Sequence, residues 1–138
     1  MESKNCLPVV KILELLKSKS FENIVRLSSR TNLYKSDKGI LYIKTSKDYG
    51  YTNKTFWYSI NPNDVINNKV DYIVLVGGFD GYFIIPVSYI LDYGKKYHVG
   101  CVKGGREHFT ILRRSGRYFR NESKNPEDDI TRFFISAS

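Results

Sequence analysis

Apolar residues recur at helical spacing near the start of the chain. Val9, Ile12, Leu13 and Leu16 lie three or four residues apart in LPVVKILELLKSK, which is the pattern of a helix with one buried face. Pro8 suits the first turn of such a helix, and the lysines near its end suit the negative end of the helix dipole. The pattern predicts one amphipathic helix.

From Glu22 onward the pattern changes to short β-branched and aromatic runs separated by Gly, Asn, Asp and Pro, which is typical of strands and turns. Two of these runs, 71–76 and 81–86, are continuously apolar and predict a central hairpin covered on both faces, turning through 77–81. The predicted strands are 22–29, 39–46, 55–60, 71–76, 81–86, 97–102, 108–114 and 131–136.

Short helices are expected where an asparagine precedes a proline and acidic residues, at 61–64 and 125–129, and after Pro86. No repeat or low-complexity linker divides the chain. We therefore expect one domain spanning 1–138, in the α+β class and mainly β, with an N-terminal helix and short flanking helices.

The sequence shows neither a membrane-spanning run nor a secretory signal, and this bears on the expected cellular location. No apolar run reaches the roughly 18 residues that a membrane-spanning helix needs, and the start, MESKNCLP, lacks the basic-then-apolar order of a secretory signal. Cys6 and Cys101 are far apart in the sequence, which favours reduced thiols over a disulfide. We expect a cytoplasmic protein with no membrane partner.

Charge points to a polyanionic partner. Lysine and arginine number 22 against 14 acidic residues, a net charge of +8. The excess is concentrated in 26–54, with seven basic and two acidic residues, and in 103–120, with six and one. A solvated lysine face explains the first segment equally well, whereas the second is rich in arginine, which favours a specific anion contact.

Candidate chemistry is sparse. His98 and His108 are the only histidines, and no Gly-x-Ser-x-Gly elbow is present, which disfavours nucleophilic hydrolysis. His98, Cys101 and His108 lack a fourth ligand for zinc, and strand residues three apart face opposite ways. We predict no catalytic residue, no metal and no cofactor.

One enzymatic alternative remains. The strand GILYIKTS presents Lys44, and the order of the following strands resembles the PD-(D/E)xK nuclease core. In that family a lysine two residues beyond a carboxylate orients the water that attacks DNA beside magnesium. Tyr42 stands at the position of that carboxylate. An active or degenerate nuclease domain of this kind is therefore the second interpretation.

Two polar segments have the composition of DNA-contacting loops, namely cations for phosphates and small polar groups for base edges. In the first, strand alternation would direct Val25 and Leu27 to the core and the polar side chains outward; a polar edge strand is the alternative. The second is a glycine-interrupted hairpin tip. The candidates are Arg26, Ser28, Ser29, Arg30 and Asn32, then Lys44, Ser46, Lys47, Tyr49, Tyr51, Asn53 and Lys54.

A third segment, 106–120, reads as a strand pair around Ser115-Gly116, with Phe109 and Ile111 inward and His108, Thr110 and Leu112 outward. Crowded guanidinium groups repel one another without an anion, so a phosphate backbone explains them. Pairing with Glu127, Asp128 and Asp129 is the structural alternative. The candidates here are Arg106, Arg113, Arg114, Arg117 and Arg120, together with Lys103 in the preceding glycine turn. Trp57, between Phe56 and Tyr58, is more typical of a core residue than of a ligand contact.

The run from Arg26 to Pro86 contains RLSSRTNLYKSDKGILYIKTSK, TFWYSI and DYIVLVGGFDGYFIIP. It resembles DNA-recognition domains of bacterial restriction endonucleases, above all the B3-like domain in specificity subunits of McrBC-type systems such as the LlaJI family. The resemblance covers about half to two-thirds of the chain. It implies an open β-barrel of about seven strands with two arms that grip the major groove, here 26–32 and 44–54, assisted by 106–120.

The AAA+ motor and the nuclease of such systems are missing, so the resemblance implies a separate recognition domain whose partners are double-stranded DNA and other subunits of a restriction complex. The first interpretation is therefore sequence-specific binding of duplex DNA by a domain that is not itself an enzyme. The alternatives are the nuclease above and a β-barrel that binds RNA or protein. An RNA-binding protein would stack bases on exposed aromatic residues such as Trp57, Tyr49 or Tyr51.

Overall fold

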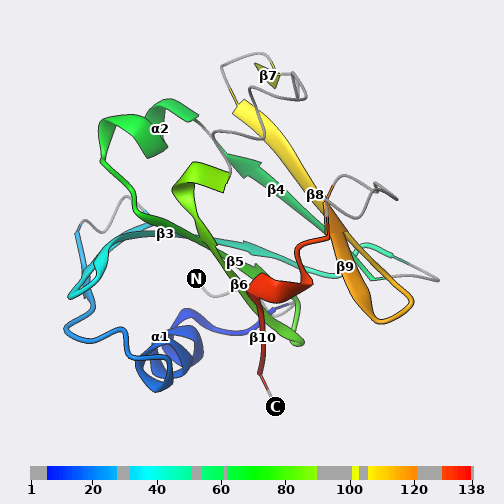
Figure 1. The fold of residues 1–138 in the computed structure, drawn as a ribbon, viewed down its shortest axis with the longest axis horizontal. Coiled ribbons are helices and arrows are strands. Elements are labelled where there is room, and N and C mark those ends of the chain that lie inside the picture. Colours follow the sequence, from blue (N-terminus) through cyan, green and yellow to red (C-terminus); the bar gives the residue numbers. More distant parts are fainter. Residues whose placement is uncertain are drawn as a thin grey trace.

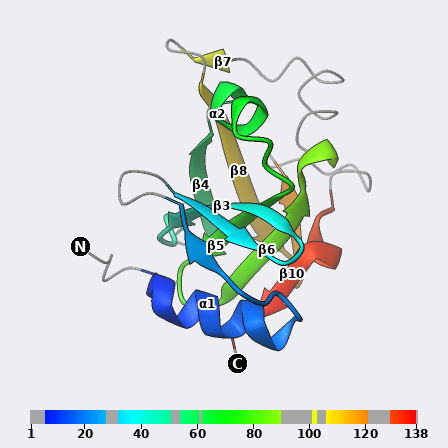
Figure 2. The same cartoon turned by 90° about the vertical axis from the view of Figure 1, so that its left-hand side faces the viewer.

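Two β-sheets and the N-terminal helix form three layers in the computed structural model (Figure 1). The structure describes residues 6–27, 32–50, 54–60, 62–89, 101–102, 106–120 and 129–137. Helix α1 covers one side of the larger sheet, which we call sheet A, and the smaller sheet B covers the other side (Figure 2). The expectation of a mainly β, α+β domain with an N-terminal helix is confirmed.

Sheet A has six strands in the order β1-β2-β3-β5-β6-β10. β3 and β5 run parallel, and every other neighbouring pair is antiparallel. Parallel neighbours need a crossover connection, which here consists of β4 and helix α2. The strand bounds are β1 Val25–Arg26, β2 Leu33–Ser36, β3 Gly39–Ser46, β5 Tyr72–Gly77, β6 Gly81–Pro86 and β10 Phe134–Ser136.

Sheet B is built around its long strand β8 (Arg106–Arg114), which pairs with three shorter strands, all antiparallel. They are β4 (Thr55–Ile60), β7 (Cys101–Val102) and β9 (Arg117–Arg120). The two sheets do not close into a barrel in the part of the chain that the structure describes. The helical elements are α1 (Val9–Ser18), α2 (Pro62–Asn67) and a 3-10 turn, η2 (Thr131–Phe133).

The central hairpin has the double coverage that its apolar sequence predicts. On β5, Ile73 and Leu75 belong to the core between the sheets, whereas Val74 and Val76 belong to the core beneath α1. All four side chains are fully buried. Because neighbouring strand residues point to opposite faces, only a strand covered on both sides excludes water from such a run.

Helix α1 also follows its sequence pattern. Ile12 and Leu16 are fully buried and pack on Leu41 and Ile43 of β3, while Val10 is 63% exposed. Burying side chains of this kind stabilises a fold by about 1.5–3 kcal/mol each. The apolar stripe therefore fixes which side of the helix meets sheet A.

The two sheets are in close contact at Gly77, the last residue of β5. A Cβ atom there would lie 2.6 Å from the ring of Phe56 on β4, well inside van der Waals contact. Glycine is required at this position because the aromatic ring occupies the space that any side chain would need.

The expected inward direction of Val25 and Leu27 is wrong. Val25 is 61% exposed and Leu27 is 47% exposed, because β1 is a two-residue edge strand with β2 as its sheet partner. Alternation along a strand determines which side chains share a face, but a face is buried only where another layer of the protein packs against it. The predicted strand 22–29 is correspondingly short, and β2 falls in a segment where no strand was expected.

The strand expected at 131–136 is half as long as predicted, because Thr131–Phe133 form the 3-10 turn η2 and only Phe134–Ser136 form a strand. Three other expectations are met. The helix expected at 61–64 is α2, residues 87–89 are helical, and the strand pair around Ser115-Gly116 is β8 and β9. Of the expected strand 97–102 only Cys101–Val102 is described, and the helix expected at 125–129 lies mostly outside the described residues. No helix in the described ranges has the length and apolar character to cross a membrane.

Candidate nucleic-acid interface

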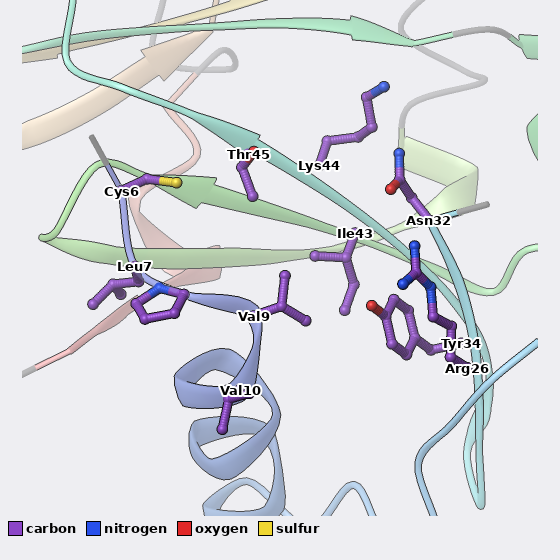
Figure 3. A pocket seen from close by; sticks show the side chains of 11 residues that line it. Cys6, Leu7, Val9, Val10, Arg26, Asn32, Tyr34, Ile43, Lys44 and Thr45 are labelled. Carbon is purple, nitrogen blue, oxygen red and sulfur yellow. The ribbon is translucent and has the colours of Figure 1, made fainter. Parts of the chain in front are cut away.

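A pocket of about 540 Å³ lies between the start of α1 and the edge of sheet A (Figure 3). Leu7, Val9 and Ile43 give it apolar walls, and Figure 3 shows the side chains of Asn32 and Lys44 on the rim away from Leu7. The guanidinium group of Arg26 lies beside Tyr34 near Asn32. Three of the predicted DNA contacts, Arg26, Asn32 and Lys44, thus share one pocket although 18 residues of sequence separate the first from the last.

Strand pairing explains how these side chains meet. Arg26 stands opposite Tyr34 in the β1–β2 ladder, and its guanidinium carbon lies 5.9 Å from the centre of the Tyr34 ring. The carbonyl of Asn32 accepts a 2.9 Å hydrogen bond from the backbone N–H of Ile43. Lys44 is the next residue of β3. The pairing of β1, β2 and β3 therefore brings all three side chains to this edge of the sheet.

The electrostatics of the pocket favour an anion. Its lining includes Arg26 and Lys44 and, among the residues that the structure describes, no aspartate or glutamate; the first turn of α1 holds no acidic residue. Partly apolar walls lower the effective dielectric constant, which strengthens the attraction of both cations for an anion. The pocket can hold phosphate oxygens at its rim and an apolar or aromatic group against its walls.

Lys44 is also the residue on which the nuclease alternative depends. Its Nζ lies 5.6 Å from the centre of the Tyr42 ring, so an aromatic residue takes the place where that family has a carboxylate. No cluster of three or more His, Cys, Asp or Glu side chains able to hold a metal ion is found among the residues that the structure describes. The thiol of Cys6, in the wall of the pocket, is buried and free.

Two candidates in the second segment have structural roles. The hydroxyl of buried Ser46 accepts a 2.9 Å hydrogen bond from the backbone N–H of Trp57 and donates to the carbonyl of Lys47. Lys54 forms a 2.5 Å ion pair with Asp80 in the β5–β6 turn. Both side chains tie β3 and β4 to neighbouring elements, so we do not include them in the interface.

Lys47 and Tyr49 remain on the surface. The Nζ of Lys47 lies 4.8 Å from the centre of the Tyr49 ring, which is 51% exposed. A cation held over an exposed aromatic ring can contact a phosphate while the ring lies against a sugar or base. Lys47 lines a second pocket, of about 250 Å³, together with Asp48 and Asp80, so these two residues do not share the pocket of Arg26 and Lys44.

The four arginines around the β8–β9 turn are divided between the two faces of sheet B: Arg114 and Arg117 are cross-strand partners on the outer face, and Arg113 and Arg120 lie on the inner face. Arg120 is fully buried, with its guanidinium carbon 3.9 Å from the centre of the Phe109 ring. The Nε of Arg117 donates to the carboxylate of Asp129, so the intramolecular alternative is confirmed for this arginine. Arg113 is exposed, and Arg114 is half-buried with its guanidinium over Phe119.

The pKa of Asp129 depends on its burial and on its hydrogen-bond partners. Burial by itself would raise the pKa of this carboxyl, but hydrogen bonds from Arg117 and Thr131 more than offset that effect, and the pKa of Asp129 is lowered. The pair holds the turn before η2 against β9, where Asp129 forms a bridge with Phe119. Arg117 therefore has a structural partner that competes with any phosphate.

Seven of the predicted DNA contacts remain, one at the start of a strand and six outside the described residues. Arg106 begins β8. Six others lie outside the described residues: Ser28, Ser29, Arg30, Tyr51, Asn53 and Lys103.

The apolar wall of the pocket was missed by sequence reasoning, which used Val9 only as part of the helix stripe. In the sequence, Val10 could have indicated this wall, because it is an apolar residue outside the stripe that α1 buries. An apolar position on the wrong side of an amphipathic helix indicates a second contact surface. Tyr34 had no signal of its own, since the strand that carries it was not expected.

Comparison with models of known protein families, with curated proteins and with solved structures finds no match for this chain.

Proposed function

We propose that this protein binds duplex DNA through the edge of sheet A, as the target-recognition module of a restriction system. The observation that carries the proposal is the convergence of Arg26, Asn32 and Lys44 at one pocket. Arg26 and Lys44 bind phosphates, and Asn32, whose amide is both donor and acceptor, contacts a base edge or the backbone. The net charge of +8 supplies the long-range attraction.

Topology supports a two-armed grip. In an antiparallel pair the start of one strand faces the end of the other, and Leu33 at the start of β2 pairs with Tyr42 near the end of β3. The β1–β2 connection and the β3–β4 connection therefore leave sheet A at the same end. This is the arrangement that two arms around one duplex need, and it supports the finer part of the proposal, a B3-like open barrel.

The first experiment measures binding of a labelled random-sequence duplex by fluorescence anisotropy at several salt concentrations. We expect the Arg26→Ala/Lys44→Ala variant to bind on the order of tenfold more weakly at low salt. If both cations contact phosphates, the slope of log K against log salt should become shallower by about 1.8, that is, about 0.9 per contact.

The matched control is Lys17→Ala/Lys19→Ala, which removes the same charge from the end of α1 that lies away from the pocket. It should retain most of the duplex affinity. Equal weakening by the two variants would show that net charge alone drives binding. Absence of duplex binding at low salt would refute the proposal, and cleavage of the duplex by the wild type with magnesium would favour the nuclease alternative.

A further inference from the structure

The outer face of sheet B carries an exposed aromatic row. On β4, Phe56 and Tyr58 are buried between the sheets, so Trp57 points outward and is 41% exposed. On β8, Ile111 is fully buried, and its neighbour Leu112 is half-buried on the outer face. The expectation that Trp57 belongs to the core is therefore wrong.

Strand register makes this row continuous. Thr55 pairs with Leu112, and Leu112 pairs with Phe119 of β9, while Trp57 pairs with Thr110. Direct cross-strand neighbours on one face lie about 5 Å apart and diagonal neighbours about 7–8 Å apart. Trp57, Leu112 and Phe119 thus form a contiguous apolar strip across three strands, which we call the sheet-B strip.

Cations stand at one end of the sheet-B strip. The guanidinium carbon of Arg114 lies 5.0 Å from the centre of the Phe119 ring, and Arg117, the cross-strand partner of Arg114, is on the same face of the sheet. The carboxylate of Asp129, whose backbone bridges to Phe119, is bound by Arg117. The strip therefore pairs aromatic faces with positive charge, the combination that binds single-stranded nucleic acids by base stacking and phosphate contact.

We propose that the sheet-B strip is a second binding site, for single-stranded DNA, in which a base stacks on Trp57 and a phosphate contacts Arg114. Leu112, between Trp57 and Phe119, offers an apolar contact for the methyl group of thymine. Uracil lacks this methyl group, and we therefore assign the strip to DNA rather than to RNA. Charge complementarity distinguishes this partner from an apolar protein surface.

This site is independent of the proposed duplex interface. The sheet-B strip faces away from sheet A, whereas the pocket of Arg26 and Lys44 lies on the side of α1 (Figures 1 and 2). Each surface can therefore be removed by substitution while the other is left intact, and either proposal can fail alone.

Trp57 is the only tryptophan in the chain, so its intrinsic fluorescence reports directly on the strip. Titration with oligothymidylate of about 12 nucleotides, within the range of known single-strand site sizes, should quench the emission saturably. The apparent affinity should fall with added salt because phosphate contacts release counterions. No quenching at low salt would overturn the proposal.

Variants are compared by anisotropy of labelled oligothymidylate, with far-UV circular dichroism to confirm folding. Trp57→Ala should weaken binding by roughly fivefold to a hundredfold, the effect of losing one stacked base, and Trp57→Phe should restore part of the loss. Phe79→Ala is the matched control, because Phe79 is 60% exposed in the β5–β6 turn, outside sheet B. It should bind as the wild type does.

Arg26→Ala/Lys44→Ala separates the two proposals. It should keep the affinity for oligothymidylate even though it loses affinity for duplex. Equal weakening of oligothymidylate binding by Trp57→Ala and Phe79→Ala would overturn a specific strip. Tighter binding of oligouridylate than of oligothymidylate would overturn the assignment to DNA.

Discussion

Arg120 shows how position outweighs residue type. In the sequence it belongs to a cluster of four arginines that points to phosphate binding. In the fold it alternates with Arg117 and Phe119 on β9 and falls on the same inner face as buried Tyr118. Its guanidinium lies against the ring of Phe109, which provides a cation–π contact in place of an external anion.

The buried hydroxyl of Tyr82 leads to a prediction about stability for a single residue. Its side chain is fully buried beneath α1, and the structure shows no hydrogen-bond partner for its hydroxyl within the described residues. Tyr82→Phe removes a polar atom that costs free energy to bury, so stability at neutral pH should be unchanged or up to about 1 kcal/mol higher. Urea unfolding followed by circular dichroism measures this difference. A loss of stability would indicate a partner for the hydroxyl.

The same substitution tests the ionisation of Tyr82. Burial raises its pKa from 10.0 to about 12, because the phenolate would lose its hydration. The folded chain holds this proton more tightly than the unfolded chain, so the stabilisation is complete below pH 10 and is lost as the pH rises through about 12. Wild type should therefore lose roughly 3 kcal/mol more than Tyr82→Phe over this interval. Parallel curves for the two proteins would contradict the shifted pKa.

At the scale of elements, the connection between the two sheets depends on side chains rather than on a ladder; the hydroxyl of Tyr58 on β4 donates a 2.8 Å hydrogen bond to the carbonyl of Val76 on β5. Ser46 ends β3 and accepts the backbone N–H of Trp57 on β4. Local pattern predicts both strands well, since each alternates or runs apolar over its full length. The local pattern does not predict that the hydroxyl of Ser46 joins β3 to β4, because this hydrogen bond forms only once the two sheets have packed together.

Ser46→Ala should therefore lower the free energy of unfolding by about 1–2 kcal/mol, because a buried N–H loses its acceptor. Loosening the start of β4 should also shift the Trp57 emission to longer wavelength. Ser36→Ala is the control, since Ser36 is equally buried but bonds only within the β2–β3 turn, to Gly39 and Lys38. It should cost similar stability without changing the emission. An emission shift in both variants would point to a general loosening instead.

At the scale of the molecule, sheet A belongs to both cores, with Leu75 facing sheet B and Val76 facing α1 on the same strand. We expect the layers to unfold together. Trp57 fluorescence, which reports sheet B, and far-UV circular dichroism should give coincident urea transitions. Ile12→Ala beneath α1 should lower both midpoints equally, with a cost of about 2–5 kcal/mol. Separate transitions would show that sheet B folds independently.

Hydropathy pattern and composition are sufficient for the α1 stripe, the β5–β6 hairpin, the β8–β9 pair and the cationic character of the chain. These features depend on neighbours a few residues apart, and local spacing encodes them. The exposure of Val25, the outward direction of Trp57 and the burial of Arg120 were decided by tertiary structure, because alternation divides a strand into two faces without saying which face another layer will cover. The pocket joining Arg26 to Lys44 has the same origin, since only the pairing of β1, β2 and β3 brings those side chains to one edge.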